Sequence, residues 1–379
     1  MDFELSPTET MVQQTARKIA EQRLRPLAAE LDRTERFPVE SLKALADLGL
    51  MGVNIPADLG GAEAGAVSYA VAMMEIASAC ASTAVTMAVT NMVGEVIVQL
   101  GTEEQRGRYV PKLTSGEYVA GAFALSEPEA GSDPGSMRTV ARKVPGGWEI
   151  DGQKQWITSG AHAGVFVVWA RTGDAGTKGI SCFLVEGGTK GLRVGKHEDK
   201  MGLRASNTVG LTFESCFVPD DALLGELGQG FKIAMIALDG GRIGIASQAC
   251  GIASAALRDA TAYSLQRKQF GQPISDFQAI QWSLADCRVE LDAARSLALR
   301  AAWLKQNKRV FSKEAAMAKV FASEKANLIC NRALQVLGGY GYTRDFAVER
   351  YIRDVRVTTI YEGTSEIQRT VIARMLLRA

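Results

Sequence analysis

The sequence predicts an α+β multidomain protein in which helices are followed by an antiparallel sheet and then by a helical bundle. Three observations support this. Apolar residues recur at helical spacing through residues 1–117. Residues 118–229 change to short β-branched segments between Gly or Pro turns. Residues 230–379 return to long, Ala-rich helical segments with short breaks, which is typical of an antiparallel bundle. We place the domain boundaries at these two changes of pattern.

The N-terminal part contains two capping boxes. The first, Ser6–Pro7–Thr8–Glu9, predicts a helix that runs to Pro26, which we expect to bend or end it. The second, Thr102–Glu103–Glu104–Gln105, predicts a short helix that ends before Pro111. Between them, the pattern predicts helices at 37–49, 66–79 and 83–100. The charge-free run 76–94 has the length of a membrane span, but its Ala, Ser and Thr content favours a buried helix pair.

The middle and C-terminal parts have distinct signals. Strands are predicted by β-branched and aromatic segments at 119–125, 139–144, 148–157, 165–170, 180–185 and 209–218. The gaps between them are too short for helical crossovers, so we expect antiparallel pairing. Bundle helices are predicted at 231–267, 277–307, 313–337, 346–355 and 366–377. Residues 338–341 are expected to form a loop.

Composition excludes several classes of function. A net charge of +1 gives no overall field that would attract nucleic acid or an anionic membrane. The six cysteines have no short spacing, which argues against a zinc site and fits reduced thiols in cytoplasm. With only two histidines, a His-based triad or metal site is not expected. No charged-then-apolar leader, G-x-G-x-x-G or Walker A motif is present.

Glu362 is the candidate for acid–base chemistry. It ends the β-branched and aromatic run 359–361 and precedes Gly363, which permits a tight turn. Thr364 or Ser365 can cap the helix that follows. Tyr361 and Ile360 can exclude water from the carboxyl, and desolvation makes a carboxylate a better base. A solvated loop glutamate is the alternative interpretation.

Five further motifs suit a flat, phosphorylated ligand, and each also has an ordinary interpretation. Residues 123–133 read as a loop with free N–H groups, or as a simple turn. In 154–160, Trp156 can stack on a ligand or lie in the core. In 238–242, two glycines allow a close approach, and Asp239 and Arg242 can form a surface pair. Residues 267–271 suit a phosphate and an adenine, or simply complement the helix dipole. The glycines of 335–339 can expose the backbone to a diphosphate.

With these motifs in this order over its whole length, the chain resembles an acyl-CoA dehydrogenase, nearest to the short-chain (butyryl-CoA) type. The resemblance implies an N-terminal helical domain, a middle β-domain and a C-terminal four-helix bundle. It also implies FAD between the last two. The implied FAD contacts are Phe123, Leu125, Ser126, Gly131, Ser132, Trp156, Ile157, Thr158, Arg267, Phe270, Gln278, Gln335, Val336, Gly338, Gly339, Thr364, Ser365 and Glu366. The implied substrate contacts are Ser132, Asp239, Arg242, Tyr361 and Gly363.

The resemblance further implies the reaction and the partners. Glu362 matches the family's base, which removes the α-proton of an acyl-CoA while the β-hydride passes to FAD. The product is a trans-2-enoyl-CoA, and the electrons leave to an electron-transferring flavoprotein. A homotetramer is implied, with part of the FAD site contributed across a subunit interface. Relatives of the isovaleryl and long-chain types place their base on a bundle helix, where this chain has Gly240–Gly241.

Two other functions fit the same residues. An acyl-CoA oxidase, a flavin monooxygenase or a nitroalkane oxidase would keep the fold and change the chemistry. A flavin-free scaffold protein would keep only the packing. The acyl group is left open, and short straight, 2-methyl-branched and medium chains all remain candidates.

Overall fold

The computed structural model describes residues 4–174 and 176–377, and the outermost bounds of the predicted domains, 1 and 379, lie outside them. The N-terminal part is helical, and both predicted capping boxes are present. Its helices are α1 (Pro7–Ile19), α2 (Arg25–Thr34), α3 (Val39–Ala46), α4 (Gly65–Ala79), α5 (Ala81–Leu100) and α6 (Glu103–Thr114).

One prediction about proline was wrong. Regular α-helix α1 ends at Ile19, a π-helical turn over Ala20–Leu24 follows, and Pro26 lies in the first turn of α2, where its missing N–H is tolerated. Pro111 does not end α6, which continues to Thr114. The last turn is held because Leu113 is buried and the Thr114 hydroxyl donates to the Val110 carbonyl at 3.2 Å.

The apolar run in α4 and α5 is packed inside the protein. Within the described part of the chain, α5 is the one helix long and apolar enough to cross a membrane by length and composition, and 89% of that window is buried in the fold. Asn91 is buried and accepts a bond from the Val53 N–H at 3.0 Å. The expected buried helix pair is confirmed.

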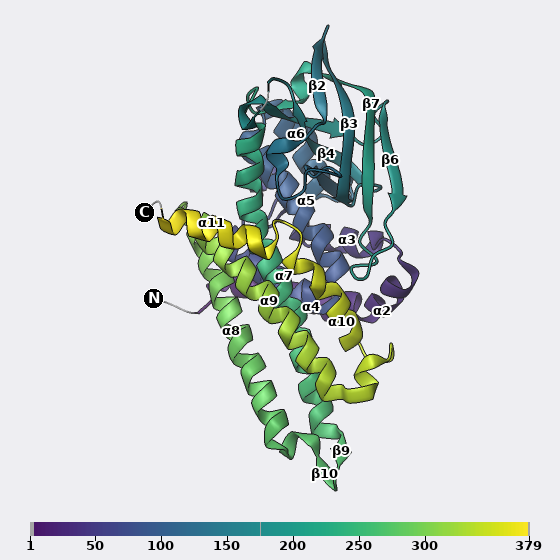
Figure 1. Cartoon of the computed structure of the whole chain (residues 1–379), viewed down its shortest axis with the longest axis vertical. Coiled ribbons are helices and arrows are strands. Elements are labelled where there is room, and N and C mark those ends of the chain that lie inside the picture. The colour runs from purple at the N-terminus through teal and green to yellow at the C-terminus, as the bar shows by residue number, and fades with distance from the viewer. Residues whose placement is uncertain (1–3, 175, 378–379) are drawn as a thin grey trace.

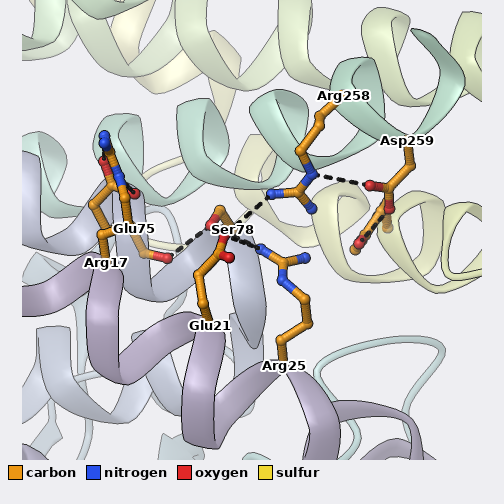
Figure 2. Close-up of polar contacts among 8 residues, drawn as sticks. Arg17, Glu21, Arg25, Glu75, Ser78, Arg258 and Asp259 are labelled. Atoms are coloured by element: carbon orange, nitrogen blue, oxygen red, sulfur yellow. Dashed lines mark hydrogen bonds and ion pairs between the residues drawn. The ribbon is translucent and has the colours of Figure 1, made fainter. Parts of the chain in front are cut away.

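Polar side chains link the N-terminal helices to the rest of the helical core. Arg17 of α1 pairs with Glu75 of α4 at 2.8 Å, and Arg25 donates to Ser78 at 3.4 Å. Figure 2 shows these side chains beside Arg258, which comes from the long helix α7 (Gly230–Gln266). Such half-exposed contacts fix the relative placement of helices more than they stabilise them.

The middle domain is a sheet with strand order β6-β7-β3-β2-β4-β5-β8, and β1 also pairs with β4. Its strands are β1 (Ala120–Ala124), β2 (Val140–Val144), β3 (Gly147–Thr158), β4 (Ala163–Arg171), β5 (Ile180–Glu186), β6 (Leu192–His197), β7 (Thr208–Pro219) and β8 (Leu223–Leu224). Most pairs are antiparallel as predicted, but β1 and β2 both pair parallel with β4. The chain passes from β1 to β4 through the β2–β3 hairpin, so no helix connects these two parallel strands.

The sheet separates two hydrophobic cores. Alternate residues of β4 face opposite ways: Val165, Val167 and Trp169 join the larger core shared with the helices, whereas Phe166 and Val168 join the smaller core within the β-domain. Trp169 also donates to the Gly230 carbonyl at 2.7 Å, at the start of α7. The face of the sheet nearest the bundle is therefore fixed to its longest helix.

The C-terminal part is built on three long helices that run side by side (Figure 1). These are α7, α8 (Gln278–Gln306) and α9 (Ser312–Leu337), followed by α10 (Val348–Arg356) and α11 (Ser365–Leu377). A small hairpin of β9 (Lys268–Gln269) and β10 (Gln272–Pro273) lies at the end of the bundle remote from the sheet. Residues Gly338–Tyr342 form a 3-10 helix where the sequence predicted a loop.

Candidate active site

Glu362 lies in a tight turn between α10 and α11. Its φ is 54°, a left-handed value that is uncommon for a residue other than glycine, and Gly363 follows at φ 90°. The Thr364 hydroxyl accepts a hydrogen bond from the Ile367 N–H at 3.4 Å, so Thr364 caps α11 as predicted. The turn directs the Glu362 side chain inward, against α7.

The Glu362 carboxylate occupies a space that Gly241 leaves open. A Cβ at Gly241 would overlap Oε2 of Glu362 and would lie 2.8 Å from its carboxyl carbon and 3.1 Å from Sδ of Met92. Oε2 is buried and has no hydrogen-bond partner within the described chain. The glycines of α7 therefore do allow a close approach, and at Gly241 the approaching group is the carboxylate of this same chain.

Burial sets the acidity of Glu362. Desolvation raises the pKa of its carboxyl from 4.5 to about 7, and the positive charges of Lys319 and then Arg242 oppose that change. Arg242 contacts Asp239 at 2.5 Å, as the sequence allowed. Because Arg242 is only 4% exposed, the interpretation of this pair as a surface ion pair is wrong. A carboxyl with a pKa near neutral pH is suited to accept a proton.

The neighbours of Glu362 differ in how they exclude water. The Tyr361 hydroxyl is hydrogen-bonded to Oε1 of Gln248 on α7, and Tyr361 packs against the larger core. Ile360 is 50% exposed, so the prediction that it shields the carboxyl was wrong.

One predicted substrate contact lies outside the helical domains: Ser132 is in an exposed loop of the β-domain.

The two predicted flavin loops of the β-domain are brought together. The Gln155 N–H donates to the Ser126 carbonyl at 2.9 Å. The buried Lys154 ammonium contacts Oε1 of Glu127 at 2.8 Å and the Leu125 carbonyl at 3.1 Å. Phe123 packs on Trp169 with ring centroids 4.3 Å apart. A buried ion pair therefore fixes one loop to the other.

Trp156 is presented to the outside. It is 61% exposed and has a φ of 64°, so the alternative of a core tryptophan is wrong. Ile157 beside it is buried, and Thr158 is half-buried at the end of β3. A large, exposed aromatic ring on a fixed strand end can stack on a flat ligand.

The predicted contacts at the start of α11 are Thr364, Ser365 and Glu366, whereas those within 267–278 and 335–339 lie at the far end of the bundle. A cavity of about 860 Å³ there is lined by Arg267, Phe270, Val336, Gly338 and Gly339 among others. The Arg267 guanidinium lies 5.4 Å from the ring centre of Tyr340. Gln278 and Gln335 are exposed and do not line the cavity. At helical rise, Arg267 lies roughly 39 Å along α7 from Gly241.

Comparison with known families decides the affiliation. Three family models match successive parts of the chain: "Acyl-CoA dehydrogenase, N-terminal domain" over residues 6–117, the middle domain over 122–216 and the C-terminal domain over 228–377. This chain belongs to the acyl-CoA dehydrogenase family. It is therefore an oxidoreductase of a flavoprotein family, with that family's three-domain fold.

Similar proteins include short-chain members of the acyl-CoA dehydrogenase family. The mitochondrial short-chain specific acyl-CoA dehydrogenase of Bos taurus is 50% identical over 99% of this chain and 92% of that protein. Butyryl-CoA dehydrogenase from Megasphaera elsdenii has a TM-score of 0.98 at 41% identity, with both chains fully covered. A chain from a structure of the electron transferring flavoprotein of Acidaminococcus fermentans has a TM-score of 0.99 at 42% identity, also with full coverage.

The site of this acyl-CoA dehydrogenase fits a flavin. A Cβ added at Gly338 or Gly339, beside the cavity at the bundle end, would meet no atom within 4 Å, so the backbone there is open to a diphosphate. Trp156 offers an exposed ring in the β-domain. The expected FAD thus has a surface for each of its two halves, although one chain holds these surfaces far apart.

Sequence reasoning missed one charged residue of the site. Lys319 of α9 is fully buried, and its ammonium donates to the Gly363 carbonyl at 2.7 Å. The sequence signal was present, because Lys319 interrupts a buried stripe of alanines at 315, 318, 322 and 326. Three other side chains of this chain contact the turn or lie beside it, and no pattern in the sequence singled them out: Gln248, Gln368 and Met92.

Proposed function

We propose that this enzyme oxidises a short-chain acyl-CoA to the trans-2-enoyl-CoA, with Glu362 as the base that removes the α-proton. The observation that carries the proposal is the Glu362 carboxylate itself. Its Oε2 is buried and has no hydrogen-bond partner in the described chain, and desolvation raises the pKa of its carboxyl to about 7. A carboxyl with this pKa is about half ionised at pH 7, and its anion is a stronger base than that of an ordinary glutamate.

The backbone of the same turn supplies a second function. The Glu362 N–H donates to no acceptor within the described residues, so it is free to hold the thioester oxygen as negative charge develops on it. Base and oxyanion donor then belong to one residue, and their spacing is fixed by the turn. Bound FAD would supply the acceptor for the hydride that leaves the β-carbon.

The surroundings of Glu362 support a short acyl chain. Sδ of Met92 lies against Gly241, and the Tyr69 hydroxyl lies 2.6 Å from where a Cβ of Gly244 would be. Both side chains are buried and occupy volume beside the carboxylate along α7. The short-chain relatives of Bos taurus and Megasphaera elsdenii support the same choice of substrate.

The geometry of the bundle also supports assembly. The cavity near Arg267 and the Glu362 site are too far apart in one chain for a single dinucleotide to reach both, so we propose that each FAD is shared between two copies. A homotetramer built from two such dimers is the assembly that we propose.

We propose an electron-transferring flavoprotein as the electron acceptor. The six cysteines are free and buried, which fits a reducing cytoplasm.

The test is the isosteric variant Glu362→Gln. It keeps the shape of the side chain and removes the base, so we expect normal flavin content and a turnover lower by about two to four orders of magnitude. The control is Glu40→Gln on α3, an exposed acid paired with Arg36 at 3.0 Å, which should behave as wild type. Anaerobic bleaching of the flavin by acyl-CoAs from C4 to C16, straight and branched, reports the chain preference. Near-normal turnover of Glu362→Gln would refute the proposal.

A further inference from the structure

Lys319 is a buried cation without a carboxylate partner. Its side chain is fully buried on α9, and no carboxylate oxygen of the described residues lies within 4.0 Å of its ammonium. The recorded hydrogen bond of its ammonium goes to the Gly363 carbonyl at 2.7 Å. Burying an ammonium without an ion pair is costly, so such a lysine marks a place where charge serves a function.

The Gly363 carbonyl belongs to the turn that carries Glu362. Nε2 of the buried Gln368 donates to the same carbonyl at 2.9 Å and to the Glu362 carbonyl at 3.2 Å. Lys319 and Gln368 thus hold both carbonyls of the turn from the α9 and α11 side. The left-handed backbone of Glu362 needs such support, because that conformation is unfavourable for a residue with a side chain.

The other charged groups near Glu362 are largely neutralised. Arg242 on α7 is paired with Asp239 at 2.5 Å, and Glu95 on α5 is paired with Lys305 on α8 at 2.5 Å. Burial raises the pKa of the phenols of Tyr69 on α4 and Tyr361, so both are neutral at pH 7. Glu366 on α11 is exposed. The cation that remains uncompensated beside the carboxylate is Lys319.

We propose that Lys319 is the positioning residue of the base: it holds the turn through the Gly363 carbonyl and supplies the positive charge that keeps the Glu362 carboxylate ionised in a dry site. This inference rests on the proposed role of Glu362. Burial lowers the pKa of the Lys319 ammonium to about 8, so it still carries its charge at pH 7. The chemistry needs that charge because an unpaired, desolvated carboxylate would otherwise take up a proton before substrate arrives.

The test compares three variants at position 319 by the pH dependence of kcat/KM. Lys319→Met removes both charge and donor, Lys319→Gln keeps a donor without charge, and Lys319→Arg keeps both. In the first two, we expect the acid limb of the profile to move up by about one to three pH units, the usual effect of a nearby opposite charge. In Lys319→Arg, the limb should return towards that of the wild type.

The matched control is Lys325→Met on the same helix, where the ammonium pairs with Glu290 of α8 at 2.9 Å, away from the turn. It should leave the profile unchanged. Flavin content and thermal melting of each holoenzyme report folding, and Lys319→Gln serves if Lys319→Met fails to fold. An acid limb that stays in place in folded Lys319→Gln overturns the inference, whereas activity in Glu362→Gln would overturn the proposed base instead.

Discussion

Gly241→Ala is the sharpest perturbation that this site offers. The new methyl would overlap Oε2 of Glu362 and lie 2.8 Å from its carboxyl carbon. Because carbon atoms pack at about 3.5–4.0 Å, the carboxylate must move by roughly 1 Å. A misplacement of that size costs about 10²-fold in rate. Overpacking costs about 1–3 kcal/mol, and the helix gains about 1 kcal/mol from Ala over Gly, so we expect the variant to fold.

The neighbouring Gly240→Ala is the control. Its methyl would meet Nζ of Lys305 at 3.2 Å, the flexible end of a long side chain that can shift by a few tenths of an ångström. We expect it to keep wild-type turnover and to gain up to about 1 kcal/mol of stability. The assay is steady-state oxidation of butyryl-CoA with flavin content measured in parallel. If Gly241→Ala turns over as fast as Gly240→Ala, the placement of the carboxylate against α7 is wrong.

Two further predictions concern stability. Lys154→Met leaves Glu127 buried and unpaired, so urea unfolding should show a loss of about 3–5 kcal/mol together with weaker flavin retention, and a loss below about 1 kcal/mol would contradict the bridging role of the pair. Glu362 binds its proton more tightly when folded, so its carboxyl destabilises the fold as the pH rises from 4.5 to about 7, by roughly 3 kcal/mol at 1.36 kcal/mol per pKa unit. Glu362→Gln should therefore be more stable than wild type at pH 8, with the difference shrinking towards pH 4.5. A pH-independent difference would show that burial does not set this pKa.

Local signals explain what could be predicted from the sequence. The capping boxes at Ser6 and Thr102 form because their hydrogen bonds join residues three apart, and the long bundle helices follow from their Ala-rich periodicity. Strand β6 was missed because Leu192–His197 is largely exposed and lacks an alternating pattern. The parallel pairing of β1 with β4 was missed because it depends on which strands meet in space.

The site shows the same division between local and distant information. Glu362 and the glycines of α7 could be singled out from their own neighbourhoods in the sequence. That the carboxylate fills the space above Gly241 could not be predicted from sequence, since it depends on how α7 and the turn before α11 pack. Lys319 reaches the turn from a third element, α9, so no local pattern links it to Glu362.

The contact between Gly241 and Glu362 also restricts where a base can be placed in this fold. A side chain at 241 and the carboxylate of 362 compete for one volume, because a Cβ at the first overlaps an oxygen of the second. An acid on α7 at 241 would therefore point into the space that the acid from the turn now fills. In this chain, glycine at 241 leaves that space to the acid at 362. The absence of a side chain at Gly241 makes room for the Glu362 carboxylate, although glycine in the helix costs about 1 kcal/mol of stability relative to alanine.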